Sequence, residues 1–386
     1  MDTPFVYDKY VTGKNFIGRK SSCTVLGNLL SQGEHVVIWD APKTGKTSLI
    51  QQTMWNLRIT GKQFTVCEIS LLNIRDAATF LTRLGTTVLR SVASTPDEYA
   101  RLMQRHLAGT HFVFDQRVYS EKDQIVSLDW DIDDTDIMAM LRLPSRLAQD
   151  GMQPLFLILD EFQSLANCPQ AEKIWKALEQ VLSESRGSQG NTCTFLFVGS
   201  MVNAMKEIFV TGRYFYRQVT RFQLPPVEEK EIVEHVVKGF LSGGKVIDRN
   251  LLMGMCRLFK NHLWYINHFV AICDAKSKGY IVESTLMEAL SAMISIHEPR
   301  FKSIVNNLTT FQLGLLKAIL DGHMKFSSSE VIQKYALNSS ANVKRLKDAL
   351  MKKEIITFDE KEEPYLLDPL FEYWVRRYYF EMDTTS

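Results

Sequence analysis

Short apolar runs alternate with helical patterns in the first half of the chain. The run 35–39 is rich in β-branched residues, and a turn that contains Gly45 follows it. Apolar residues then recur at helical spacing from Leu49 to Leu57, and Gly61 lies just beyond them. Because residues three or four positions apart share one face of a helix, this order predicts a strand, a turn and an amphipathic helix.

The alternation continues along the chain with one break. Residues 95–133 carry scattered charges instead of a periodic pattern, so we interpret them as an insertion. Strands that alternate with helices predict a parallel sheet covered by helices, which is an α/β fold. Further strands are expected at 64–69, 155–159, 195–198 and 222–224, and helices at about 76–94 and 172–185.

Two helix boundaries are predicted between residues 133 and 144. Asp133, Asp134 and Asp136 resemble a metal-binding cluster, yet acidic residues also cap helix N-termini and complement the helix dipole. We favour the cap. The helix that they begin is expected to be interrupted at Leu143-Pro144, because proline disfavours a helical residue before it.

The second half of the chain has a helical pattern from 228 to about 295. His262 and His268 are interpreted as helix residues, and Trp264, Tyr265 and Phe269 as packing residues. Three helices, two short strands and an aromatic helix follow, and this order predicts a winged helix. These elements are expected at 311–320, 328–335, 340–353, 355–358 and 365–367, with a capping box at Ser327 and Glu330 and a buried face at Val343, Leu346 and Leu350.

Composition indicates a globular protein with more than one domain. Of 386 residues, 45% are hydrophobic and 23% charged, and one core seldom organises a chain of this length. The first ten residues lack a signal-peptide pattern, and no apolar run approaches the roughly 18 residues of a membrane span. We therefore expect a cytoplasmic protein without a membrane partner, whose six scattered cysteines are reduced thiols.

The turn after the first strand carries a P-loop pattern. In a P-loop, backbone N–H groups surround the phosphates, lysine reaches the β- and γ-phosphates, and a hydroxyl residue binds Mg²⁺. Lys46 and Thr47 are expected to take the last two roles. Asp40 occupies the first glycine position of the pattern. Its negative carboxylate repels phosphate unless the side chain points away from the loop. The candidate nucleotide-binding residues are Pro42, Lys43, Thr44, Gly45, Lys46, Thr47 and Ser48.

Polar residues at the ends of two later strands complete the candidate chemistry. Asp160 is expected to hold a Mg²⁺-bound water, and Glu161 to orient the attacking water. Ser200 is expected beside the γ-phosphate, because ligands of parallel sheets bind at the carboxyl ends of the strands. One of three arginines beyond it is expected to reach phosphate in its own or a neighbouring subunit: Arg213, Arg217 or Arg221.

The ordered set of motifs from about residue 14 to 380 resembles the archaeal-type ATPase family, on the STAND-like side of the AAA+ superfamily. The motifs are 15–19, the P-loop, 159–163, 198–200 and 368–374. The resemblance implies an AAA+ core at 1–226, a helical lid at 227–300 and a winged helix at 301–386. It also implies that Phe16, Gly18 and Arg19 lie near the base or the lid, and that Arg217 matches the arginine after the sensor strand. Residues 261–263 depart from the Gly-x-Pro of the family's lid.

These observations favour a nucleotide-dependent switch that binds ATP or ADP with Mg²⁺ and hydrolyses ATP. One alternative is a DNA-binding initiator or transposition-type protein, and another is a hydrolysis-deficient ATP-binding scaffold. Residues 301–386 contain twelve Lys/Arg and twelve Asp/Glu, and the expected wing 359–363 is mostly acidic. Because phosphate contacts supply most of the affinity for DNA, an intramolecular or protein-contacting winged helix is favoured over DNA binding, and a homo-oligomer or another protein is the candidate partner. The expected recognition helix offers Asn342, Lys344, Arg345 and Lys347.

Overall fold

The computed structural model describes residues 4–186 and 193–382, which fall into two units. The first, the sheet unit, comprises residues 20–40 and 53–224. The second, the helical unit, comprises the residues up to 19, the segment 41–52, and the chain from 225 onwards. The P-loop segment therefore groups with the C-terminal half of the chain.

A five-stranded parallel sheet forms the centre of the sheet unit, in the order β2-β5-β6-β1-β7. Trp39 is paired with Gly199, and Ser70 with Asp160, so the carboxyl ends of four strands lie at one edge. The α/β prediction is thus confirmed. The strands are β1 Val36–Trp39, β2 Thr65–Ser70, β5 Leu155–Asp160, β6 Cys193–Gly199 and β7 Thr220–Arg221.

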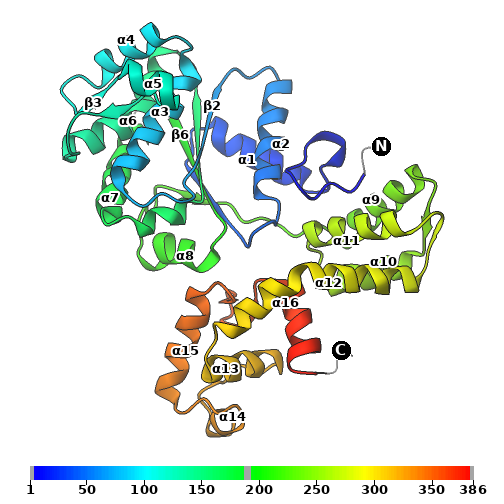
Figure 1. Ribbon diagram of the computed structural model, residues 1–386. Helices are drawn as coiled ribbons and strands as arrows, with labels where there is room; N and C mark the ends of the chain where they lie inside the picture. Colours follow the sequence, from blue (N-terminus) through cyan, green and yellow to red (C-terminus); the bar gives the residue numbers. More distant parts are fainter. Residues whose placement is uncertain (1–3, 187–192, 383–386) are drawn as a thin grey trace. The chain divides into compact units, whose positions relative to one another are not determined.

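Both faces of the sheet are covered, which explains why β1 and β6 are buried along their whole length. Figure 1 shows α1 on one side of the sheet and α3, α6 and α7 on the other. The helix α2, Lys46–Ile59, begins in the P-loop segment and ends in the sheet unit. The other main helices are α1 Lys20–Ser31, α3 Ala77–Val92, α6 Asp134–Asp150, α7 Ala171–Arg186 and α8 Val202–Lys206.

The predicted insertion is folded onto the sheet unit. Val126 is fully buried and its N–H donates to Thr86 Oγ1. Its elements are α4 Pro96–His106, β3 Phe112–Val113, α5 Gln116–Lys122 and β4 Ser127–Leu128. Its two strands, β3 and β4, pair with each other in a separate antiparallel sheet.

Two sequence predictions in the sheet unit are wrong. The helix α6 continues through Pro144, because Leu143 and Leu147 are buried on either side of it and their packing outweighs the missing N–H. The last strand is Thr220–Arg221 and not 222–224. Phe222 still donates its N–H to Val37, but the two prolines that follow residue 224 have no N–H to extend the pairing.

Four lid helices begin the C-terminal half: α9 Glu229–Ser242, α10 Arg249–Leu258, α11 Leu263–Lys276 and α12 Glu283–Asn306. Two short parallel strands, β8 Val246–Ile247 and β9 Tyr280–Ile281, join their loops. The predicted winged-helix order follows, as α13 Thr310–Leu320, α14 Ser329–Lys334, α15 Ser340–Lys352, β10 Ile356–Phe358, β11 Pro364–Leu366 and α16 Pro369–Trp374.

The buried face of α15 is as predicted, whereas the cap of α14 is not. Val343, Leu346 and Leu350 are all buried. The N-cap of α14 is Ser328 instead of Ser327, because the helix begins one residue later and Ser328 Oγ accepts from the N–H of Val331.

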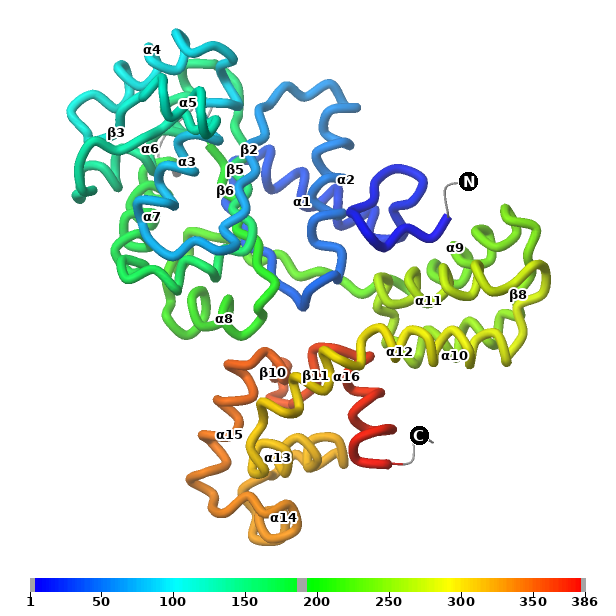
Figure 2. Tube along the Cα trace, viewed as in Figure 1, coloured from blue at the N-terminus to red at the C-terminus, as the bar shows by residue number. Residues whose placement is uncertain are grey.

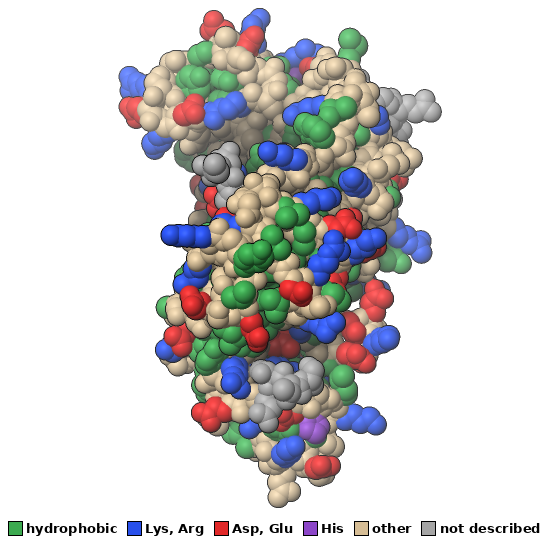
Figure 3. All heavy atoms as spheres, turned by 90° about the vertical axis from the view of Figure 1, so that its right-hand side faces the viewer, with side chains coloured by type: hydrophobic (Ala, Val, Ile, Leu, Met, Phe, Trp, Pro, Cys, Tyr) green, Lys and Arg blue, Asp and Glu red, His purple; other side chains and the backbone are tan. Residues whose placement is uncertain are grey.

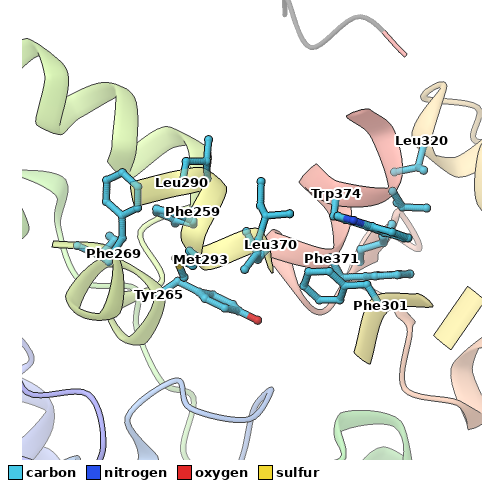
Figure 4. Close-up of a cluster of buried hydrophobic side chains, with 14 of the residues drawn as sticks. Phe259, Tyr265, Phe269, Leu290, Met293, Phe301, Leu320, Leu370, Phe371 and Trp374 are labelled. Carbon is cyan, nitrogen blue, oxygen red and sulfur yellow. The ribbon is translucent and has the colours of Figure 1, made fainter. Parts of the chain in front are cut away.

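The lid helices and the winged helix share one hydrophobic core. Figure 4 shows Tyr265 and Met293 at the lid end of this core, and Phe301, Phe371 and Trp374 at the winged-helix end. The helix α12 has 24 residues, so it is about 36 Å long and contributes to both ends. Figure 2 follows it from the lid hairpins into the winged helix. The two parts therefore pack as one body.

All six cysteines are buried free thiols, as predicted. Among the described residues, no helix combines the length and the apolarity needed to cross a bilayer.

Candidate nucleotide-binding site

The P-loop has two residues in the left-handed backbone region, Lys43 at φ +65° and Gly45 at φ +95°. Glycine adopts this region freely, but for a lysine it costs about 1–2 kcal/mol. Lys46 opens α2 and is 7% exposed, and its Nζ donates to the carbonyl of Ala41 at 2.8 Å. The ammonium group therefore lies across the loop at the N-terminus of a helix, an arrangement that suits an anion.

Arg19 connects the P-loop to the start of the lid. Its Nη1 donates to Thr44 O at 2.7 Å and its Nε to Pro225 O at 2.7 Å. Gly18 precedes it at φ +62°, and a Cβ there would lie 2.7 Å from Glu231 Oε2. These contacts are the surroundings of Gly18 and Arg19, and their place near the base or the lid stays a prediction.

The N-terminal segment is bonded to the outer turns of α2. Ser48 Oγ accepts from the N–H of Val11 at 3.1 Å, and Gln52 Oε1 accepts from the N–H of Gly13 at 2.7 Å. Phe16 is half-buried and closes the turn that Gly13 begins. The sequence analysis did not predict this role of Gln52, because the residue lies outside every recognised motif.

At the carboxyl edge of the sheet, the carboxylate of Glu161 receives two side-chain donors. Ser200 Oγ donates to Glu161 Oε2 at 2.7 Å, and Gln163 Nε2 donates to the same oxygen. Glu161 has φ +56°, and its N–H donates to Asp160 Oδ1 at 3.0 Å. The structure thus brings Glu161 and Ser200 together, and it adds Gln163, whose place in the motif 159–163 was the only sequence signal.

Gly199 permits this arrangement. A Cβ at Gly199 would lie 2.4 Å from Met205 Cγ and 2.7 Å from Gln163 Oε1. Real Cβ atoms essentially never show distances below 3.0 Å, so any larger residue at 199 would have to displace Met205 or Gln163.

Oxygen donors suited to Mg²⁺ are present in both units. Asp160 ends β5 with a half-buried carboxylate, and Thr47 offers a half-buried hydroxyl in the first turn of α2. Carboxylate and hydroxyl oxygens are each suited to this hard cation.

The predicted arginines have other surroundings. Arg217 is exposed at φ +60°, with its guanidinium 5.2 Å from the ring centroid of Tyr216. Arg221 lies over Trp39 at 4.2 Å, where β7 pairs with β1. An arginine-finger role for one of these residues stays a prediction.

Trp264, which the sequence assigned to packing, packs against the core of the helical unit and also contacts the P-loop. Lys43 Nζ lies 3.4 Å from the ring centroid of Trp264, and Trp264 Nε1 donates to Tyr7 O at 2.6 Å. Burial and the nearby Arg300 lower the pKa of Lys43, while Asp368 opposes this shift. His262 was expected inside the helix, but it is the N-cap of α11.

The acidic cluster at α6 is a helix cap, as predicted. Asp133 and Asp136 form a reciprocal capping box, and His111 Nδ1 is 2.9 Å from Asp136 Oδ2. Ligand atoms of these three residues lie within 4.8 Å of one another. The hydrogen bond that His111 makes to the carboxylate of Asp136 raises the pKa of His111, and the carboxylate oxygens of Asp136 also accept from backbone N–H groups.

The winged helix offers little positive charge to a polyanion. Lys344 and Arg345 are exposed on α15, but Lys347 folds over Phe326 and Asn342 donates to a backbone carbonyl. The wing 359–363 is exposed and carries four acidic residues and one lysine. Figure 3 shows blue and red side chains interspersed over the face in view.

The comparisons with known proteins support the fold. A family model described as a probable winged helix domain matches residues 299–377. No curated protein matches the chain in sequence. A Walker-type ATPase of Pyrococcus abyssi is similar in structure, with TM-score 0.65, 12% identity, and coverage of 97% of this chain and 99% of that one.

A second similar structure is the ORC2 protein of Aeropyrum pernix in its ADPNP and ADP complexes. It has TM-score 0.58 and 15% identity, and the alignment covers 96% of this chain and 94% of that one. The chain thus has the α/β fold of these two proteins, and a winged helix follows it, as the sequence predicted.

Proposed function

We propose that the chain is a STAND-like ATPase that binds ATP with Mg²⁺, hydrolyses it, and uses the bound nucleotide as a switch. The observation that carries this proposal is the pair of prepared groups: Lys46 folded across a P-loop, and Glu161 held by Ser200 and Gln163 at the carboxyl edge of the sheet. Both groups match the roles that phosphoryl transfer requires.

In this proposal the P-loop backbone and the ammonium of Lys46 bind the phosphates. Thr47 and Asp160 hold Mg²⁺, which neutralises phosphate charge when it is bound. Glu161 orients the attacking water. Ser200 restricts the carboxylate of Glu161 to one geometry, in addition to its expected place beside the γ-phosphate.

The remaining sequence predictions complete the proposal. Phe16, Gly18 and Arg19 lie near the base or the lid, and Arg217 supplies charge to phosphate. The core ends at residue 226 and the lid at residue 300. ADP is the nucleotide product of hydrolysis. Asp40 is half-buried next to the loop, and we propose that its charge keeps turnover slow.

Hydrolysis is tested by measuring phosphate release from the full chain and from two variants. Glu161→Gln is expected to keep ATP binding while turnover falls about 10²- to 10⁴-fold, the range for loss of a group that acts on the nucleophile. Ser200→Ala is expected to have a smaller effect in the same direction. Unchanged turnover in Glu161→Gln would leave this residue with a structural role only.

A DNA-binding role is not proposed. Two cations are exposed on α15, the wing 359–363 is mostly acidic, and twelve basic residues balance twelve acidic ones in residues 301–386. We propose instead that the winged helix contacts protein, either in this chain, in a second copy or in another partner.

A further inference from the structure

Lys43 is the P-loop residue that touches the lid. Its backbone is in the left-handed region, the residue is exposed, and its ammonium lies over the face of Trp264 at 3.4 Å. Both residues belong to the helical unit. A lysine over an indole is a cation–π contact, and tryptophan provides the strongest such face among the aromatic residues.

The indole of Trp264 is held in place by its surroundings. Its Nε1 donates to Tyr7 O at 2.6 Å. The rings of Tyr265 and His297 lie edge-on to it, with centroids at 5.0 and 5.7 Å. A movement of Trp264 therefore displaces Tyr265, because Tyr265 is only 5% exposed and is closely packed.

Tyr265 leads directly to the winged helix. Its hydroxyl donates to Asp368 Oδ1 at 2.8 Å, and Arg300 Nη2 donates to Asp368 Oδ2 at 2.6 Å. Asp368 is the N-cap of α16, because Oδ1 also accepts from the N–H groups of Leu370 and Phe371 at 3.0 Å each. The carboxylate thus joins the lid to the first turn of the aromatic helix.

The charges along this path favour a response to phosphate. The ammonium of Lys43 is attracted by the Trp264 ring and by Asp368, and it is repelled by Arg300. A phosphate on the P-loop carries full negative charge, and attraction between full charges exceeds that between a cation and a ring quadrupole. An occupied P-loop therefore competes with Trp264 for Lys43.

We propose that Lys43 and Trp264 are positioning residues that transmit phosphate occupancy of the P-loop to the N-cap of α16 through Tyr265, Arg300 and Asp368. This inference rests on the proposed nucleotide binding and identifies how the winged helix responds to it. Because the lid and the winged helix share one core, a change at this cap reaches the whole winged helix.

The test is hydrogen–deuterium exchange of the peptide 368–374 in the full chain, with and without ATP and Mg²⁺. ATP is expected to accelerate exchange in the parent about two- to fivefold, which corresponds to the loss of a partly exposed cation–π contact. Lys43→Gln and Trp264→Leu are expected to show this faster exchange without ATP, and ATP should add nothing further. Lys14→Gln, which removes an exposed lysine elsewhere in the helical unit, is the matched control and should behave as the parent.

Calorimetric titration with ATP separates this inference from the proposed function. If the parent does not bind ATP, the proposed function is refuted. Faster exchange in nucleotide-free Lys43→Gln would in that case still support the path from Lys43 to α16. If exchange in Lys43→Gln equals that of the parent without ATP, the path is refuted whatever ATP does. Binding of ATP to the parent with no change in the peptide refutes the coupling.

Discussion

The space around Gly199 provides the sharpest test of the carboxyl-edge geometry. An alanine Cβ would stand 2.4 Å from Met205 Cγ, 2.5 Å from Met205 Sδ and 2.7 Å from Gln163 Oε1. Met205 is fully buried, and β6 is paired on both sides, so neither can move away freely. Overpacking of this kind costs about 1–3 kcal/mol of unfolding free energy.

Gly199→Ala should therefore unfold at lower urea than the parent, and the displaced Gln163 should leave Glu161 with fewer donors and slow ATP turnover. Gly254→Ala is the control, because its Cβ would meet nothing within 4 Å on α10. That change should raise stability by about 0.5–1 kcal/mol. If Gly199→Ala is as stable and as active as the parent, the assigned packing at the edge of the sheet is incorrect.

Two further predictions concern titration and DNA. Burial, with Arg300 nearby, lowers the pKa of His297 to about 4, below the value of 6.5 for an exposed histidine. Between these two pKa values the unfolded chain binds more protons than the folded chain. The contribution of His297 to folding stability is therefore complete above pH 6.5 and is lost as the pH falls towards 4. After allowance for solvent screening, this contribution is about 1–2 kcal/mol. Urea unfolding at pH 7 and pH 4.5 should show this loss, and His297→Gln should reduce it; equal slopes for the two proteins would show that His297 is not responsible. Duplex DNA binding across a salt series should be weak with a small slope, with or without ATP, because few phosphates can be neutralised. Tight binding that falls steeply with salt and disappears when Lys344 and Arg345 are changed to Ala would replace the protein-contact proposal by a DNA-binding one.

The fold was predictable where local pattern and packing agree. The strand runs that became β1, β5 and β6 are apolar throughout, as strands buried on both faces must be. Predictions failed where tertiary contacts outweighed local preference. Pro144 lacks the N–H group that a continuous helix needs, so the sequence predicts an interruption there. Buried neighbours on both sides nevertheless keep α6 continuous.

The candidate site was predictable as far as its motifs reached. The sequence placed Glu161 and Ser200 at strand ends, and the parallel order of β5 and β6 brings them into contact. The contact between Lys43 and Trp264 joins residues that are 221 positions apart (264 − 43). An aromatic residue at a helix start has no pattern that distinguishes packing from a cation–π contact, so only the three-dimensional structure could show it.

The central claim is that Lys46 binds the phosphates of ATP, and the direct measurement is the melting temperature with and without ATP and Mg²⁺. A ligand that binds only the folded chain at 100 times its Kd stabilises it by about 2.7 kcal/mol, which for a chain of this length raises the melting temperature by about 3 °C. The parent is predicted to show this shift, and Lys46→Ala is predicted to show none, whatever its own melting temperature. Equal shifts in both proteins, or no shift in the parent at saturating ATP, would contradict the account.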